Sequence, residues 1–336
     1  MTLTENPPQT YPTDIPATLA GATEDFKSAM RVAHELIVNG TARDAGIQAP
    51  VNRACDQVSA QLRWHIAARP AAADELGAYV FRETYPYFSL SPLIARSYTK
   101  PRGYAGDYLT LQMVYDDRPV GTDRLGRHID RWFLGIPASR AVKNRRRLLR
   151  DVIVDIAHAN TGRRTEITSL ACGPAREVLD VLGEAHRRDI NATCVDADNE
   201  ALAYAQSAAR RAGVADQVTF AQANIVRAAL GRETLELRDQ DLVYSIGLID
   251  YLRDGVVVAL LDWIYDRLRP GGTAIVGNFD VGNPDKAFMD HVLHWRLVHR
   301  SAEDLVALFA ASKFGPARVE VRTEDTGINL FAITHR

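Results

Sequence analysis

Hydrophobic residues recur with two different periods along this chain. Up to about residue 140 they recur every three or four positions, which predicts helices over 23–40, 50–69 and 71–88. Beyond that point, short apolar or β-branched runs alternate with helical stretches. The predicted strands are 166–171, 191–196, 217–223, 241–247 and 273–279, and the predicted helices between them are 175–188, 199–213 and 254–268.

This alternation predicts an α/β fold, in which a parallel, doubly wound, Rossmann-like sheet is covered by helices on both faces. Residues 317–336 show two further strands joined by a turn at Asp325 and Gly327, which predicts a C-terminal antiparallel hairpin and a seven-stranded sheet. The opening segment 1–22 is rich in Pro and Thr and is expected to be a mobile arm. We therefore expect this arm, a helical lid or substrate domain over 23–139 and a sheet domain over 140–336.

Composition narrows the classes of partner. A net charge of −2 over 336 residues argues against a nucleic acid or an anionic membrane as partner. One basic run, 143–150, has apolar residues at helical spacing, so we interpret it as the solvated face of a helix. No signal-peptide pattern opens the chain and no apolar run is long enough to span a bilayer, so we expect a cytoplasmic protein. The scattered Cys55, Cys172 and Cys194 are typical of reduced core residues, and we expect no metal site.

The stretch SLACGPARE, residues 169–177, joins the first predicted strand to the helix that follows it. Small residues stand at alternate positions, Ala171, Gly173 and Ala175, and would let a ligand lie directly on the backbone. Doubly wound sheets bind ligands at this end of their strands. Pro174 suits the first helical turn. Small residues at such a turn are also typical of plain packing, so the turn alone leaves both interpretations open.

Polar residues follow the next two strands. Asp196 comes twenty-three residues after the glycine of that turn, where an acid can accept hydrogen bonds from both ribose hydroxyls of a nucleoside. Asp198 is better explained as a helix cap. Asn224 and Ile225 either pair with and pack on an adenine or form a polar turn before a helix. Glu177 disfavours a pyrophosphate and suits a cationic ligand such as an amino group, which points to S-adenosylmethionine rather than NAD.

From residue 140 onward the chain resembles the class I S-adenosylmethionine-dependent methyltransferases in the order and spacing of EITSLACGPARE, CVDADNEALAYAQ, VTFAQANI, DLVYSIGLIDYL and RLRPGGTAIVGNF. The resemblance implies an S-adenosylmethionine site over 140–336. The chain departs from the family pattern where Ala stands in place of the first and third glycines of the turn. The implied contacts are Ala171, Gly173 and Pro174 for the methionine part, Asp196 with Ala197 for the ribose, Asn224 with Ile225 for the adenine, and Ser245 with Gly247 beside the sulfonium.

The segment YTKPRGYAGDYLTLQMVY, residues 98–115, resembles one in bacterial methyltransferases that make a 3-hydroxy fatty-acid methyl ester, where a helical domain precedes the cofactor fold. Its tyrosines offer ring faces that attract a sulfonium cation, and its Arg102 could hold a carboxylate bidentately. Alternatively, the segment is a turn between lid helices and the rings pack as core. The tyrosines in question are Tyr98, Tyr104, Tyr108 and Tyr115.

These features predict methyl transfer from S-adenosylmethionine to a small or lipid-like metabolite, at a carboxylate or hydroxyl, leaving S-adenosylhomocysteine. Azetidine-2-carboxylate synthases look similar but cyclise the same cofactor and release methylthioadenosine, so cyclisation is one alternative, and a non-catalytic cofactor-binding module is another. We expect a small-molecule substrate, no nucleic acid and no membrane insertion, while no motif fixes an oligomeric state. The candidate catalytic groups are Tyr104, Asp107, Tyr108 and His299, with Tyr251 as a further candidate base.

Overall fold

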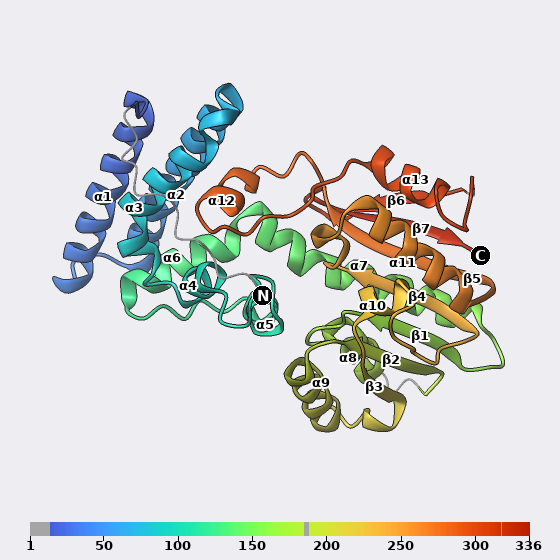
Figure 1. Cartoon of the computed structure of the whole chain (residues 1–336). Helices are drawn as coiled ribbons and strands as arrows, with labels where there is room; N and C mark the ends of the chain where they lie inside the picture. Colours follow the sequence, from blue (N-terminus) through green and yellow to red (C-terminus); the bar gives the residue numbers. More distant parts are fainter. Residues whose placement is uncertain (1–13, 185–187, 317) are drawn as a thin grey trace. The chain divides into compact units, whose positions relative to one another are not determined.

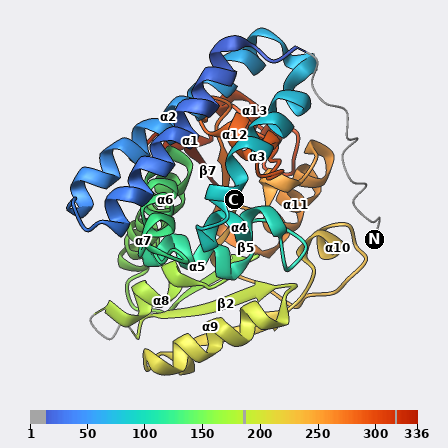
Figure 2. The same ribbon diagram turned by 90° about the vertical axis from the view of Figure 1, so that its left-hand side faces the viewer.

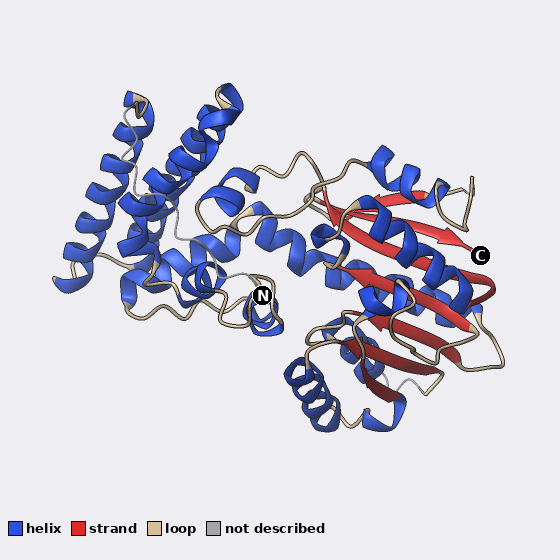
Figure 3. Cartoon of the chain, viewed as in Figure 1, coloured by secondary structure: helices blue, strands red, loops and turns tan. Residues whose placement is uncertain are grey.

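The computed structural model describes residues 14–184, 188–316 and 318–336 (Figure 1). Their contacts divide the chain into two compact units. The helical unit comprises residues up to 101, 119–133 and 284–295, and the sheet unit comprises 102–118, 134–283 and 296–336. Figure 3 shows that the strands all belong to the sheet unit.

The helical unit is built around an aromatic core. The rings of Phe26, Phe88, Trp132 and Phe288 pack on one another, with Phe88 stacked on Trp132 at a centroid distance of 5.5 Å. These rings come from four different helices, so the core ties together segments far apart in the sequence. The helices are α1 (Ala17–Val38), α2 (Asp44–Ala68), α3 (Ala73–Phe88), α4 (Pro92–Thr99), most of α6 (Arg124–Gly135) and α12 (Lys286–His291), with a short 3-10 turn at Pro70–Ala72.

The start of α1 corrects the expected arm. Helix α1 begins at Ala17, so the arm cannot extend to residue 22, and residues 1–13 lie outside the described part of the chain. Leu19 and Phe26 are fully buried at helical spacing, so the apolar face of the helix already includes Leu19. The helix therefore begins directly after its N-cap, Pro16. Thr23, the first residue of the predicted helix, lies inside α1 instead, where its hydroxyl donates to the carbonyl of Ala20.

The seven-stranded sheet has the order β3-β2-β1-β4-β5-β7-β6. Neighbouring strands among β1 to β5 are parallel, and β7 is antiparallel to both β5 and β6. The predicted doubly wound sheet and terminal hairpin are therefore confirmed, with Gly327 at φ 73° in the hairpin turn. The strands are β1 (Thr165–Leu170), β2 (Ile190–Asp196), β3 (Val218–Gln222), β4 (Gln240–Ile246), β5 (Leu268–Phe279), β6 (Glu320–Thr323) and β7 (Asn329–His335).

Helices cover both faces of the sheet, and each face has its own apolar core. One core joins α7, α8 and α9 to strand residues such as Tyr244, and the other joins α10, α11 and α13 to residues such as Val243. Figure 2 shows α9 running along β2. Short helix α5 belongs to this unit as well and contacts α7. The bounds are α5 (Tyr108–Asp116), α7 (Pro137–Ala159), α8 (Arg176–Gly183), α9 (Asn199–Arg211), α10 (Ile225–Ala229), α11 (Asp254–Arg267) and α13 (Ala302–Ala310).

The two units do not divide at one point near residue 140. The chain enters the sheet unit at Arg102, leaves it for 119–133, and leaves it again for 284–295. Segment 102–118 joins the sheet unit because Arg102 forms ion pairs with Asp198 and Glu200 at the start of α9. A boundary drawn from local periodicity misses such long-range contacts.

Candidate functional site

A cavity of about 570 Å³ opens in the sheet unit at the carboxyl ends of β1, β2 and β4. The strand order reverses between β1 and β4, and doubly wound sheets bind ligands at that point. The register pairs Leu170 with both Val195 and Ser245, so the residues after these strands meet at one edge. The cavity is lined by Arg102, Tyr104, Gly106, Tyr108, Leu111, Ala171, Gly173, Asp196, Ala197, Asp198, Ala223, Asn224, Ile225, Val226, Ile246, Gly247, Leu248 and Tyr251.

The turn after β1 explains the alternate small residues. Ala171, Gly173 and Ala175 have φ angles of 52°, 51° and 49°, all in the left-handed region. A side chain larger than Ala would strain this backbone further, and alanine itself costs about 1–2 kcal/mol there. Strain of this kind concentrates at functional sites. Pro174 lies within the turn rather than in the first helical turn, because Ala175 is the N-cap and α8 begins at Arg176.

The Asp196 carboxylate stands between two backbone segments of the cavity. Its Oδ2 accepts the Gly173 N–H at 2.8 Å, and its Oδ1 accepts the Asp198 N–H at 2.9 Å. The side chain is 9% exposed, and burial raises its pKa while these backbone bonds oppose the rise. Each oxygen can still accept a second hydrogen bond. The carboxylate is therefore fixed in position with accepting capacity left, and Ala197 lines the cavity beside it.

Asn224 and Ile225 line the cavity after β3. Asn224 also caps α10, since its side-chain oxygen accepts the Arg227 N–H at 3.1 Å. Ile225 is 5% exposed and presents an apolar surface to the cavity. Asn224 thus forms the polar turn before α10, and it is also part of the cavity wall.

Segment 102–111 forms another wall. Arg102 donates to both carboxylate oxygens of Asp198, at 2.9 and 2.7 Å, and to Glu200 at 2.6 Å. Its guanidinium also lies 5.1 Å from the centre of the Tyr108 ring. The carboxylate that Arg102 holds is therefore one of the protein's own. Burial, with Asp196 and Asp198 nearby, raises the pKa of Tyr104 well above its ordinary value, so this phenol stays protonated.

Three residues expected at the cofactor, Pro174, Glu177 and Ser245, are not among the lining residues of the cavity. Glu177 is buried and accepts a hydrogen bond from the Tyr244 hydroxyl at 2.9 Å. Ser245 is fully buried and its hydroxyl donates to the Leu170 carbonyl at 3.2 Å. Ser245 lies in β4 and Glu177 in the first turn of α8, and each is hydrogen-bonded to a residue of a strand.

Two expected catalytic groups also lie outside the lining. Asp107 is fully buried and caps α5 by accepting the N–H groups of Leu109 and Thr110. His299 is half-buried, with Nε2 3.2 Å from Asn283 Nδ2 and Nδ1 3.1 Å from the Leu297 carbonyl.

The four tyrosines of segment 98–115 lie in different parts of the structure. Tyr104 and Tyr108 line the cavity, and Tyr251 joins them from the segment after β4. Tyr98 belongs to the helical unit and stacks on Phe81 at 4.3 Å. Tyr115 lies below the cavity, where its hydroxyl accepts a hydrogen bond from Arg145.

Sequence reasoning missed Arg145 because it stands in the basic run 143–150. In α7 it falls three residues after buried Val142 and four before buried Leu149, so it occupies the apolar face of the helix. That spacing was the available signal. Asp250, which is 1% exposed and follows β4, was missed as well. No pattern in the neighbouring sequence marks it as buried.

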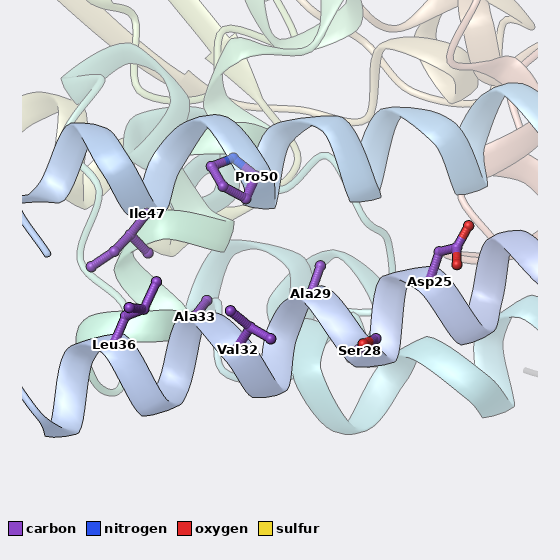
Figure 4. A pocket seen from close by; sticks show the side chains of 8 residues that line it. All are labelled: Asp25, Ser28, Ala29, Val32, Ala33, Leu36, Ile47 and Pro50. Carbon is purple, nitrogen blue, oxygen red and sulfur yellow. The ribbon is translucent and has the colours of Figure 1, made fainter. Parts of the chain in front are cut away.

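A second, smaller cavity lies in the helical unit between α1 and α2. Figure 4 shows its wall, in which apolar side chains such as Val32, Leu36 and Ile47 gather and Asp25 is the one charged group. It measures about 240 Å³ and offers little chemistry. Within residues 14–184, 188–316 and 318–336, no group of three His, Cys, Asp or Glu side chains could hold a metal, and no helix is long and apolar enough to cross a bilayer.

The strand order, the strained turn and the cavity at the switch point define the fold of the class I methyltransferases. The chain matches the model of a family described as "Putative methyltransferase" over residues 102–275, more than half its length, and belongs to that family. The match begins where the sheet unit begins.

One solved structure supports the fold. A "possible exported protein" from Bordetella parapertussis aligns over 94% of this chain and 96% of its own, at 16% identity and a TM-score of 0.55. A "putative O-methyltransferase" from Nostoc punctiforme PCC 73102 aligns over 76% and 72%, at 15% identity and a TM-score of 0.48, a likeness too low to carry an argument. No curated protein matches the chain.

Proposed function

We propose that the protein transfers the methyl group of S-adenosylmethionine to a small or lipid-like metabolite, at a carboxylate or hydroxyl. Membership of a methyltransferase family supports the reaction type. The observation that carries the proposal is the cavity itself, in which a fixed carboxylate, an apolar slot and tyrosine rings follow one another along one sheet edge.

The cavity fits the chemical groups of the cofactor. Asp196 would accept hydrogen bonds from the two ribose hydroxyls, and Ile225 with Asn224 would hold the adenine. The turn at Gly173 would bring the backbone against the methionine part. When bound, S-adenosylmethionine supplies an activated methyl group on a sulfonium cation. The Tyr104 and Tyr108 rings would attract that cation and exclude water from it.

The lining also bears on the acceptor. Tyr104 stays protonated, Asp196 and Asp198 are bound to backbone N–H groups, and Arg102 is charged. None of these four lining residues is therefore suited to remove a proton at neutral pH. A carboxylate acceptor is already ionised and needs no such base. We accordingly favour a carboxylate over a hydroxyl, and alignment of the reactants would supply most of the rate.

Mass analysis of the products tests this proposal. Purified protein would be incubated with S-adenosylmethionine, with and without 3-hydroxyoctanoate or octanoate. We expect S-adenosylhomocysteine and a methyl ester to appear in equal amounts, and only trace turnover when no acid is added. Steady formation of methylthioadenosine from S-adenosylmethionine alone would instead establish cyclisation, which the family match does not support.

A further inference from the structure

The basic run 143–150 has one member that faces inward. It contains five cations, and the four on the outer side of α7 each pair with an acid. Arg145 is 4% exposed and has no carboxylate within ion-pair distance among the residues that the structure describes. The paired side chains are Lys143 with Asp117, Arg146 with Asp180, Arg147 with Asp325 and Arg150 with Glu184.

The hydrogen-bonding capacity of Arg145 is largely unused. A guanidinium carries five N–H donors. In the described part of the chain Arg145 makes one side-chain hydrogen bond, from Nη2 to the Tyr115 hydroxyl at 3.4 Å. The other N–H donors of the guanidinium therefore remain available to a ligand.

Arg145 lies directly behind the cavity wall at Gly247. A Cβ atom placed on Gly247 would stand 3.1 Å from Arg145 Nη1 and 3.5 Å from Nη2. Gly247 lines the cavity and has a φ of 93°, a backbone conformation that favours glycine. The wall therefore has no side chain at Gly247, where it passes in front of the guanidinium.

Nearby groups favour the charged form of Arg145 but leave most of its N–H groups available for hydrogen bonds. Burial lowers its pKa, but Tyr115, Asp250 and Glu177 outweigh that effect, so the pKa is raised on balance. Asp250 and Glu177 act through space, since neither forms an ion pair with it in the described structure. The positive charge is thus compensated at a distance while the N–H groups stay available for a ligand.

We propose that Arg145 binds a carboxylate at the Gly247 end of the cavity, an assignment that rests on the proposed function. The planar guanidinium suits a carboxylate because two parallel N–H groups can meet its two oxygens. Arg102, the residue expected in this role from the sequence, is occupied by Asp198 and Glu200. The carboxylate comes either from the amino-acid end of the cofactor or from the acceptor.

Calorimetric titration of the full-length protein separates these sources. The test variant is Arg145→Met, and Arg147→Met is the control, because Arg147 lies on the same helix with its side chain 67% exposed. The ligands are S-adenosylhomocysteine and methylthioadenosine, which share the adenosine but differ in the amino-acid end. If that end is the source, Arg145→Met weakens S-adenosylhomocysteine about 10- to 100-fold and changes methylthioadenosine less than about twofold.

If the acceptor is the source, both nucleosides bind the variant normally. The loss then falls on 3-hydroxyoctanoate titrated into protein saturated with S-adenosylhomocysteine, and the methyl ester of that acid is unaffected. Equal binding of every ligand by Arg145→Met and wild type overturns the assignment to Arg145. A wild type that binds no nucleoside refutes the proposed function itself, and the assignment falls with it.

Thermal unfolding without ligand distinguishes a binding role from a structural one. Tyr115, Asp250 and Glu177 together outweigh the burial of the Arg145 charge, so Arg145→Met should lower the melting temperature only modestly. A large fall in melting temperature, with both nucleosides weakened equally, would mark Arg145 as structural and overturn the proposal. Arg145→Lys keeps the charge but loses the planar fork, and should bind the carboxylate ligand with intermediate affinity.

Discussion

Asp250 provides a test of the electrostatics beneath the cavity. It lies in the 3-10 turn Ile249–Tyr251, is 1% exposed, and accepts the Phe279 N–H on Oδ1 at 2.7 Å. Its Oδ2 has no partner among the described residues. Burial raises its pKa from the ordinary 3.8 to about 6, although the Phe279 N–H and the charges of Arg145 and Arg300 oppose the rise.

The direction in which stability changes with pH depends on whether the folded or the unfolded state binds the proton of Asp250 more tightly. Because the folded state has the higher pKa, it holds the proton between about pH 4 and 6 while the unfolded state has lost it. The free energy of unfolding therefore falls as pH rises through this window and levels off above the folded pKa. A shift of about 2 units at about 1.4 kcal/mol each gives a loss of roughly 3 kcal/mol by pH 7.

The perturbation is Asp250→Asn, which keeps an acceptor for the Phe279 N–H but cannot ionise. Urea unfolding of both proteins would be followed by circular dichroism at several pH values between 4 and 7.5. Any fixed cost of the new amide N–H groups is the same at every pH. The difference, variant minus wild type, should therefore rise by roughly 3 kcal/mol over that range. A flat difference would refute the raised pKa, and a falling one would show that the carboxylate is paired in the folded state.

Two further predictions concern segment 102–111. Arg102→Ala removes the bonds to Asp198 and Glu200, so S-adenosylhomocysteine should dissociate about three- to tenfold faster in stopped-flow measurements. The control Glu200→Gln loses only the more exposed partner and should change the dissociation rate much less. Unchanged dissociation from Arg102→Ala would rule out this contact as a restraint on the cavity. Tyr104→Ala should weaken the binding of S-adenosylmethionine about 2- to 30-fold more than that of S-adenosylhomocysteine, whose sulfur carries no charge. Tyr104→Phe should keep most of the preference for S-adenosylmethionine. Equal weakening of both ligands by Tyr104→Ala would show that the ring does not face the sulfonium.

The sheet could be predicted from the sequence because its central strands are buried on both faces. Strand β4 has six buried residues in succession, and the run Leu242, Val243 and Tyr244 at its centre marks it as a strand. The start of β5 at Leu268 was missed because Pro270 and Gly271 normally end a strand, whereas here β5 extends through them. Helix α1 was predicted to begin six residues too late, because the Pro and Thr near its start suggested a disordered arm.

The cavity wall was predictable where it follows strands, and less so elsewhere. Gly173, Asp196 and Asn224 line it because the carboxyl ends of parallel strands meet at one edge. The placement of Arg102 depends on a contact with Asp198, 96 residues away, which no local pattern reveals. His299 was chosen for its chemistry alone, and it lies outside the lining, in the loop between α12 and α13.

The proposed cofactor site depends most on Asp196, which would anchor the ribose. The variant Asp196→Ala removes the carboxylate, which also frees the N–H groups of Gly173 and Asp198, so a loss of binding could arise from the turn alone. A ligand-side control separates these effects. S-adenosylhomocysteine that lacks its 2′- and 3′-hydroxyls cannot bond to the carboxylate but still meets the same turn.

Calorimetric titration of both ligands into wild type and Asp196→Ala is therefore the most direct test of the central claim. We predict that the variant weakens S-adenosylhomocysteine by about 1.5–3 kcal/mol for each ribose bond lost, and weakens the dideoxy ligand far less. The two changes would then be strongly non-additive. Equal losses for both ligands, or unchanged binding of S-adenosylhomocysteine by Asp196→Ala, would contradict the placement of the cofactor in this cavity.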